Sequence, residues 1–260
     1  MIRDKDGEKN EGVLAGTRRA TAGPSDGKLI SVIIVVFNGE RHLERAVASV
    51  VEQDYEHREL IIIDGGSTDG TPGIIKKYQD AVAYWVSEPD NGIYDAMNKG
   101  LDAATGDWIY FLGSDDVLYD RHTLGVVSAF LDPKMSLAFG DIMYHNRGIV
   151  KSRFNPFTLL HNTIHHQGAF YNARLFRDWR YDAGIRLIAD YELNLRIYLE
   201  RMKYRHIDAV IAICDEGGQS REDLERAFSE TNMVRNKYLH GFIGRMLSLL
   251  YSIKFRINRG

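Results

Sequence analysis

The sequence has little cysteine, little proline and no long apolar run, and each shortage excludes a class of protein. Its 260 residues include one cysteine, Cys214, so no disulfide can form within the chain. The longest apolar runs, such as residues 29–37 and 60–63, are far shorter than the roughly 20 residues that a membrane-spanning helix needs. The first residues lack the apolar core of an export signal. We therefore expect a cytoplasmic protein without disulfides.

An excess of charge of one sign is also missing, which limits the partners. The formal net charge is -3, so no global positive field would gather nucleic acid. A hydrophobic content of 44% is enough to form a sizeable core. Residues 1–28 are an exception, because they mix charges, glycines and small polar groups without any period. We expect them to be a disordered leader.

From Leu29 onward, short apolar runs alternate with helical periodicity. This alternation is typical of an α/β fold whose central sheet is mainly parallel and flanked by helices. Ligands of such sheets bind at the carboxyl ends of the strands. The first half predicts, in order, strand 31–37, helix 43–51, strand 60–63 with a glycine-rich loop over 64–70, strand 83–86, helix 93–104 and strand 108–112.

The second half is less regular, and no proline-rich linker separates it from the first. We expect one continuous domain over residues 29–215 and a helical tail over 216–260. The patterns predict a helix around 124–131, strands near 137–144, 167–171 and 206–213, and helices over 189–200 and 222–238.

The end of the tail, residues 238–259, interleaves apolar and basic side chains at helical spacing. One interpretation is a last helix that covers the core. The other is a surface that contacts anionic lipid. The sequence leaves both open.

Two carboxylates, Asp115 and Asp116, follow the predicted strand 108–112 directly. Their hard oxygen ligands suit Mg²⁺ or Mn²⁺, which proteins often share with substrate phosphates. An Asp-Asp pair after a strand is more often a solvated turn or a helix cap. The context therefore has to decide between these interpretations.

Four ordered motifs supply that context, and together they resemble the family 2 glycosyltransferases of the GT-A fold, which has a Rossmann-like sheet. The close resemblance covers about 29–118, and a looser one reaches about 213. It divides the domain into a nucleotide-sugar-binding half, 29–120, and an acceptor half, 121–215. The motifs are Ser31 to Asn38 with Glu40, Ile62 to Thr71, Glu88 to Gly100, and Ala104 to Trp108 leading to Gly113-Ser114-Asp115-Asp116.

The resemblance implies a set of donor-binding residues. Asp64 would contact the base of a UDP- or GDP-sugar, but many family members have a second acid at the position of Gly65. The identity of the base therefore stays open. Asp116 would be the main ligand of a Mg²⁺ or Mn²⁺ ion, and Asp115 would contact the ribose or the metal. Phe37, Asn38 and Glu40 would line the base and ribose pocket. Each of these polar residues has a plainer interpretation as a strand end, turn or helix-start residue.

Direct displacement at the anomeric carbon needs a base near the acceptor hydroxyl. The resemblance points to Asp190, whose plainer interpretation is a helix N-cap, with Glu192 as the second choice. Lys99 would point toward phosphate, or lie on a solvated helix face that Gly100 ends. His166 would line the donor or acceptor pocket, or be a structural histidine; no zinc-binding spacing surrounds it.

The function that follows is an inverting, metal-dependent glycosyltransferase acting on a saccharide or polyprenyl-linked acceptor in polysaccharide biosynthesis. Its setting would be the cytoplasm, with peripheral contact to the inner face of the membrane. Two alternatives remain at this stage. A nucleotidyltransferase usually has a basic, glycine-rich loop after its first strand, which residues 37–40 do not provide. A non-catalytic nucleotide-sugar-binding protein would bind the donor without turnover.

Overall fold

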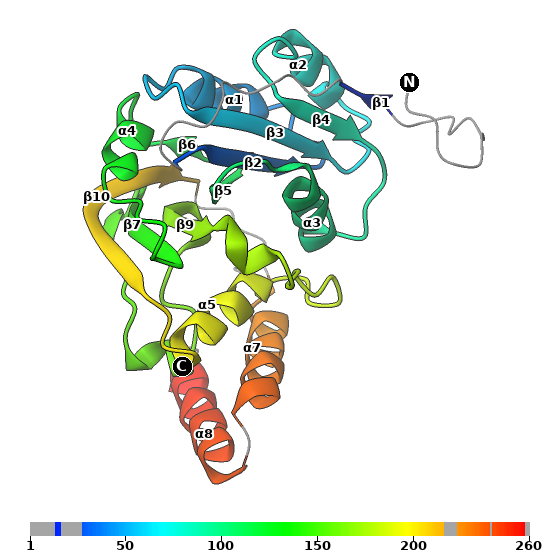
Figure 1. Ribbon diagram of the computed structural model, residues 1–260. Coiled ribbons are helices and arrows are strands. Elements are labelled where there is room, and N and C mark those ends of the chain that lie inside the picture. Colours follow the sequence, from blue (N-terminus) through cyan, green and yellow to red (C-terminus); the bar gives the residue numbers. More distant parts are fainter. Residues whose placement is uncertain (1–13, 17–27, 216–222, 240, 258–260) are drawn as a thin grey trace.

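The computed structural model describes residues 14–16, 28–215, 223–239 and 241–257. Its strands form one sheet in the order β1-β4-β3-β2-β5-β9-β7-β10-β6, with β8 paired to β7 (Figure 1). The longest ladders, β2 with β3 and β5, β3 with β4, and β7 with β10, are parallel, which confirms the predicted central sheet. The strands are β1 (Leu14–Ala15), β2 (Ile30–Val36), β3 (Arg58–Asp64), β4 (Tyr84–Ser87), β5 (Trp108–Gly113), β6 (Val117–Leu118), β7 (Leu137–Tyr144), β8 (Gly148–Val150), β9 (Ala169–Asn172) and β10 (Tyr204–Cys214).

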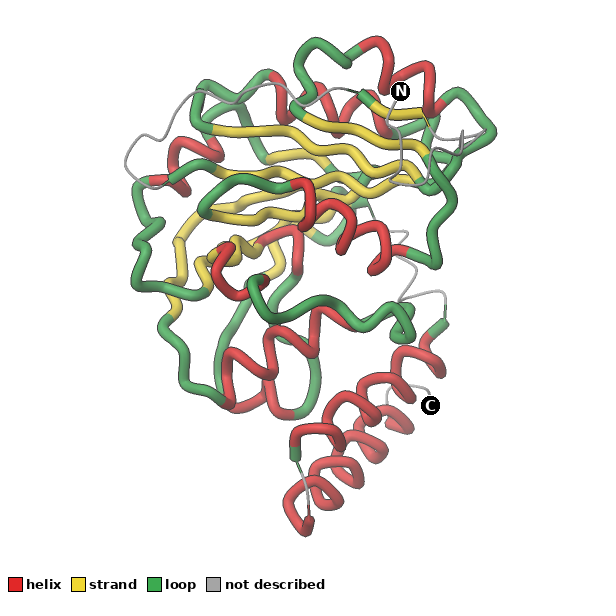
Figure 2. The backbone as a smooth tube through the Cα atoms, turned by 45° about the vertical axis from the view of Figure 1, so that its right-hand side comes forward, coloured by secondary structure: helices red, strands yellow, loops and turns green. Residues whose placement is uncertain are grey.

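Helices cover both faces of the sheet, and a helical hairpin projects from one end (Figures 1 and 2). Helices α1 (Leu43–Val51), α2 (Thr71–Lys77) and α4 (Thr123–Ser128) share a core with one face. Helices α3 (Ile93–Ala103) and α5 (Ala189–Leu199) share a core with the other. The projecting pair is α7 (Leu224–Tyr238) and α8 (Gly241–Ile257). Short 3₁₀ turns are η1 (Pro156–Leu159), η2 (His166–Gly168) and η3 (Ala173–Phe176).

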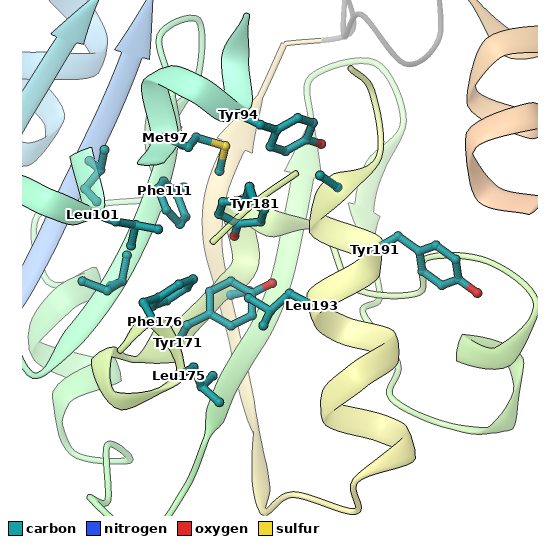
Figure 3. Close-up of a cluster of buried hydrophobic side chains, with 14 of the residues drawn as sticks. Tyr94, Met97, Leu101, Phe111, Tyr171, Leu175, Phe176, Tyr181, Tyr191 and Leu193 are labelled. Atoms are coloured by element: carbon teal, nitrogen blue, oxygen red, sulfur yellow. The ribbon is translucent and has the colours of Figure 1, made fainter. Parts of the chain in front are cut away.

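The two cores arise from the alternation of side chains along each strand. In β2, Val32 and Ile34 face the α1 side, whereas Ile33 faces α3. Gly100 lies within α3 and does not end it, contrary to the sequence-based interpretation. A Cβ at this position would be 2.5 Å from Ile33 Cγ2. The glycine therefore lets α3 lie close against the sheet. Figure 3 shows the aromatic cluster between α3, β5 and α5, in which Tyr181 lies among its neighbours.

Two sequence predictions need correction here. Leu14–Ala15, in the expected disordered leader, forms a strand paired antiparallel with Ser87 and Val86, which supply the free hydrogen-bonding edge of β4; the rest of that leader lies outside the described residues, apart from Gly16 and Lys28. The strand predicted over 167–171 begins only at Ala169. The preceding residues form η2, where a Cβ on Gly168 would lie 2.7 Å from a backbone oxygen of β7.

The described residues of the tail form the helices α7 and α8, and α7 is attached to the domain by an ion pair and by hydrogen bonds. Glu192 is almost fully buried; its Oε1 accepts bonds from Lys237 Nζ at 2.7 Å and Tyr238 Oη at 2.8 Å. Glu230 accepts bonds from the backbone N–H groups of Arg186 and Leu187, just before α5. Within the described residues, no helix is both long enough and apolar enough to cross a membrane.

Candidate active site

The carboxyl ends of β2 and β3 are joined by hydrogen bonds between their loops. Asn38, with a left-handed φ of 52°, donates its N–H to Ser67 Oγ and accepts the Thr68 N–H at its Oδ1. Glu40 Oε2 accepts the Gly70 N–H at 2.8 Å. Asn38 and Glu40 therefore fix the shape of this edge of the sheet.

Asp64 lies at the same edge but is completely buried. Its carboxylate accepts the Ser67 N–H and hydroxyl, and the Ser87 hydroxyl at 2.6 Å. These bonds occupy both oxygens, so Asp64 organises the loop and does not present its carboxylate to a ligand. Phe37 does face outward, with 65% of its surface exposed.

The loop after β4 joins this edge and contains a residue that the sequence did not single out. A Cβ on Gly65 would lie 2.5 Å from Asp90 Oδ2, so the Asp90 carboxyl group occupies the place of a side chain at position 65. Asp90 belongs to the motif Glu88 to Gly100, but only its tertiary contact with Gly65 shows that its carboxyl group lies at this edge. Lys99, predicted to face phosphate, pairs with Glu88 at 2.8 Å and donates to the Pro89 carbonyl at 3.0 Å. It stabilises the loop instead.

The Asp115 and Asp116 carboxylates lie together over Gly113. A Cβ at Gly113 would be 2.3 Å from Asp116 Oδ2 and 2.9 Å from Asp115 Oδ1, so the glycine leaves them room. Asp116 is nearly buried and accepts bonds from Gln167 Nε2 and the Asp215 N–H, both at 2.9 Å. Burial, with a contribution from the charge of Asp115, raises the pKa of Asp116 to about 7.

This pair fits a hard divalent cation. Two crowded carboxylates repel one another, and a cation between them relieves the repulsion. Among the described residues no group of three or more His, Cys, Asp or Glu side chains could hold a metal, so waters and phosphate oxygens would complete the shell, as Mg²⁺ commonly requires. A cavity of about 170 Å³ borders Asp115 and is also lined by Arg45 and His145. Both side chains can donate hydrogen bonds to an anion.

Asp190 is the second residue of α5 and lies 8% exposed. Its Oδ1 accepts the Tyr94 hydroxyl at 3.3 Å, and its Oδ2 accepts Asn162 Nδ2 at 2.7 Å. It is not an N-cap, because the cap residue is Ile188 and no side chain caps this helix. Burial raises the pKa of Asp190 to about 6. The carboxylate is therefore held in place and remains ionised at neutral pH.

A chain of buried and part-buried hydrogen bonds continues from Asp190 through Asn162. Asn162 Oδ1 accepts Asn194 Nδ2 at 3.0 Å, and Asn194 Oδ1 accepts the Tyr171 hydroxyl at 3.0 Å. An ionised carboxylate only accepts, so it fixes the orientation of both amides and requires the tyrosine to donate. The sequence offered no signal for Asn162, Asn194 or Tyr171 in this role.

The η2 turn connects the two acidic centres. Gln167 contacts Asp116, and His166 Nδ1 lies 3.9 Å from Asp190 Oδ2. Burial lowers the pKa of His166, an effect that the charge of Asp115 opposes. His166 therefore lies beside the candidate base, and its place in a donor or acceptor pocket stays a prediction. Glu192, the second choice of base, does not lie at the site, because its carboxylate faces α7.

Comparisons with known proteins identify the family of this chain. The sequence model of "Glycosyl transferase family 2" matches residues 31–228. A PGL/p-HBAD biosynthesis glycosyltransferase of Mycobacterium bovis is 33% identical over 211 residues, covering 77% of this chain and 82% of the relative. An uncharacterized glycosyltransferase of Mycobacterium tuberculosis is 36% identical over 180 residues, covering 65% of this chain and 69% of the relative.

Two solved structures share the fold. TarS 1-349 of S. aureus in complex with UDP-GlcNAc has a TM-score of 0.66 at 19% identity, covering 85% of this chain and 71% of that one. The mannosyltransferase PcManGT of Pyrobaculum calidifontis, in complex with GDP-Man and Mn²⁺, has a TM-score of 0.62 at 18% identity, with coverages of 86% and 68%. Family and fold agree, so the nucleotidyltransferase alternative is dropped. The chain belongs to glycosyl transferase family 2 and is a glycosyltransferase with the GT-A fold.

Proposed function

We propose that this glycosyltransferase moves a sugar from a nucleoside-diphosphate sugar to a saccharide hydroxyl with inversion of configuration. The observation that carries the proposal is Asp190, a nearly buried carboxylate held by Tyr94 and Asn162, with its pKa raised to about 6. Such a carboxylate is ionised at neutral pH and is a stronger base than an exposed aspartate. His166 lies beside it, toward the Asp115–Asp116 pair.

In the proposed reaction Asp190 accepts the proton of the acceptor hydroxyl while the acceptor oxygen forms its bond to the anomeric carbon. The bond from that carbon to the diphosphate oxygen breaks, and its electron pair leaves with the nucleoside diphosphate. A single displacement inverts the configuration and needs no covalent sugar–enzyme intermediate. His166, neutral because burial lowers its pKa, lines the space between the base and the donor.

The donor would bind at the carboxyl ends of β2, β3 and β5. The UDP-GlcNAc and GDP-Man complexes of the two similar structures support a UDP- or GDP-sugar. Asp115 and Asp116 would hold Mg²⁺ or Mn²⁺, which when bound neutralises charge that develops on the diphosphate. Arg45 and His145, beside Asp115, would donate hydrogen bonds to the same oxygens.

The test is release of nucleoside diphosphate from a panel of nucleotide sugars with Mn²⁺ or Mg²⁺ and saccharide acceptors. We expect Asp190→Asn to lower turnover by about 10²–10⁴-fold, the range for loss of a general base. Asp116→Asn should abolish the stimulation of transfer by Mn²⁺ or Mg²⁺. Asp102→Asn removes a carboxylate that is 67% exposed at the far end of α3 and should change neither. Full transfer by both site variants, or donor binding without turnover, would refute the proposal.

We further propose that the acceptor is a saccharide on a polyprenyl lipid in polysaccharide biosynthesis, and that α8 rests on the cytoplasmic face of an anionic membrane. Four apolar side chains of α8 are exposed at helical spacing: Met246, Leu249, Leu250 and Ile253. The 30 residues after Glu230 contain six Lys or Arg residues and no Asp or Glu. An apolar helix face in a basic segment is the combination that binds anionic lipid surfaces.

A further inference from the structure

The carboxyl group of Asp90 is fixed in an unusual position, above a glycine of the neighbouring strand end. β3 and β4 pair in parallel, so the loops after Asp64 and Ser87 leave the same edge of the sheet. Since a Cβ at Gly65 would lie 2.5 Å from Asp90 Oδ2 and 3.1 Å from its Cγ, the glycine is required for this arrangement. One loop supplies the space and the other supplies the carboxylate.

The two oxygens of Asp90 have different roles. Oδ1 accepts the Gly92 N–H at 2.8 Å, which fixes the carboxylate plane. Oδ2 accepts no hydrogen bond from any residue that the structure describes. The charge of Lys99 acts on the Asp90 carboxyl group, but its ammonium pairs with Glu88 and donates to the Pro89 carbonyl. Asp90 is half-buried, so Oδ2 is a partly desolvated acceptor without a hydrogen-bond donor among the described residues.

The surroundings suit a flat, aromatic ligand. Gly65 and Gly66 have no side chains, and Gly66 has a left-handed φ of 82°, which allows its backbone to lie close to Pro89. At the end of the adjacent strand β2, the exposed ring of Phe37 offers a stacking surface. Flat heterocycles bind where an aromatic face and a few directed polar groups meet.

We propose that Asp90 Oδ2 accepts the ring N–H of the nucleotide base and so selects the donor. This inference rests on the proposed function. Uracil, thymine and guanine carry a ring N–H on the edge that pairs with other bases, whereas cytosine and adenine have a ring nitrogen lone pair there. A lone pair facing Oδ2 would leave this partly desolvated acceptor unpaired, which discriminates against cytosine and adenine. The site therefore takes uridine, thymidine or guanosine diphosphates and rejects those of cytidine and adenosine.

Calorimetric binding of free nucleoside diphosphates in the presence of Mn²⁺ tests this selection without turnover. We expect the wild-type protein to bind UDP or GDP at least about tenfold more tightly than CDP and ADP, as for loss of a hydrogen bond to a charged group. Asp90→Ala should lose that preference, because UDP or GDP loses its hydrogen bond and CDP no longer faces an unpaired acceptor. UDP methylated at N3 cannot donate to Oδ2, so the wild-type protein should bind it at least about tenfold more weakly than UDP, and Asp90→Ala, which removes Oδ2, should reduce that difference. Asp102→Ala removes the same charge from the opposite end of α3 and should keep the preference.

Moving the carboxylate gives a second, independent test. In the Asp90→Ala background, Gly65→Asp should restore at least part of the preference for UDP or GDP, because the acid returns to the same space. Gly65→Asp alone should weaken binding, since its side chain collides with Asp90. If the wild-type protein binds no nucleoside diphosphate, the proposed function itself fails. If it binds them but Asp90→Ala weakens UDP and CDP equally, or neither, only the role of Asp90 is refuted.

Discussion

At Asp190 the fold holds a carboxylate where its neutral form is favoured. Burial outweighs the hydrogen bonds from Tyr94 and Asn162, and the pKa rises from 3.8 to about 6. Between these values the unfolded chain has lost the proton and the folded chain keeps it. The contribution of protonated Asp190 to the free energy of unfolding is therefore complete below about pH 4 and is lost as the pH rises through 6. A base that is ionised at neutral pH thus lowers the stability of the enzyme.

Asp190→Asn removes this titration. We expect the variant to be more stable than wild type at pH 7, by about 1–3 kcal/mol, and the difference to narrow at pH 4.5. Urea unfolding at the two pH values measures it. Asp102→Asn, exposed at the end of α3, should show no such pH dependence. A loss of stability in Asp190→Asn that is equal at both pH values would contradict the expectation.

At the scale of single elements, α5 positions Asp190 through the chain of hydrogen bonds that ends at Tyr171. Tyr171→Phe removes the first donor and leaves Asn194 Oδ1 unpaired, so the Asn162 amide loses its fixed orientation. We expect the acidic limb of the pH–rate profile to move up by about one pH unit, since a hydrogen bond to a charged group is weakened.

Tyr181→Phe is the matched control for this prediction. The Tyr181 hydroxyl is buried in the same aromatic cluster but has no hydrogen-bond partner among the described residues, so its removal leaves the chain of hydrogen bonds intact (Figure 3). The pH–rate profile of Tyr181→Phe should match that of wild type. If the acidic limb lies at the same pH in Tyr171→Phe and Tyr181→Phe, Tyr171 contributes packing only.

The contact of α3 with the sheet depends on Gly100. Gly100→Ala would bring a Cβ to 2.5 Å from Ile33, and we expect it to destabilise the protein by about 1–3 kcal/mol, as overpacked cores do. Gly73→Ala, in α2, meets no atom within 4 Å and should be neutral or stabilising by up to about 1 kcal/mol. Thermal unfolding of the two variants gives the comparison, and equal effects would show that Gly100 is not required for close packing.

For the molecule as a whole, the α7–α8 hairpin is the part outside the sheet and its covering helices (Figure 2). If α8 rests on a membrane, Leu249→Glu with Ile253→Glu should lower binding to anionic vesicles by roughly tenfold or more, and added salt should weaken wild-type binding. Val126→Glu alters an equally exposed apolar residue on α4 and should not. Nucleotide affinity should be unchanged in all three proteins. Binding that the α8 substitutions leave intact would assign these side chains to another partner.

The sequence alone determined the α/β alternation and the family, and it pointed to Asp115, Asp116 and Asp190 as candidate site residues. Period-2 and period-3.6 patterns reflect local geometry, and the motifs are contiguous in the chain. It misassigned Glu192 as the second choice of base. Asp190 and Glu192 both lie in the first turn of α5 on different faces, and only the packing of α7 shows that Glu192 faces that helix. It also gave Leu14–Ala15 no structure, because a two-residue strand has no readable period and depends on the open edge of β4.

What only the tertiary structure decided is how separate motifs meet. The Asp64 carboxylate accepts hydrogen bonds from Ser67 and Ser87, whereas Asp90, from the loop after β4, fills the space that Gly65 leaves. Gln167 and His166 connect two acidic centres that lie far apart in the chain. Parallel strands bring distant loops to one edge, so which side chain reaches a shared space depends on register and on backbone approach, and a linear motif contains neither.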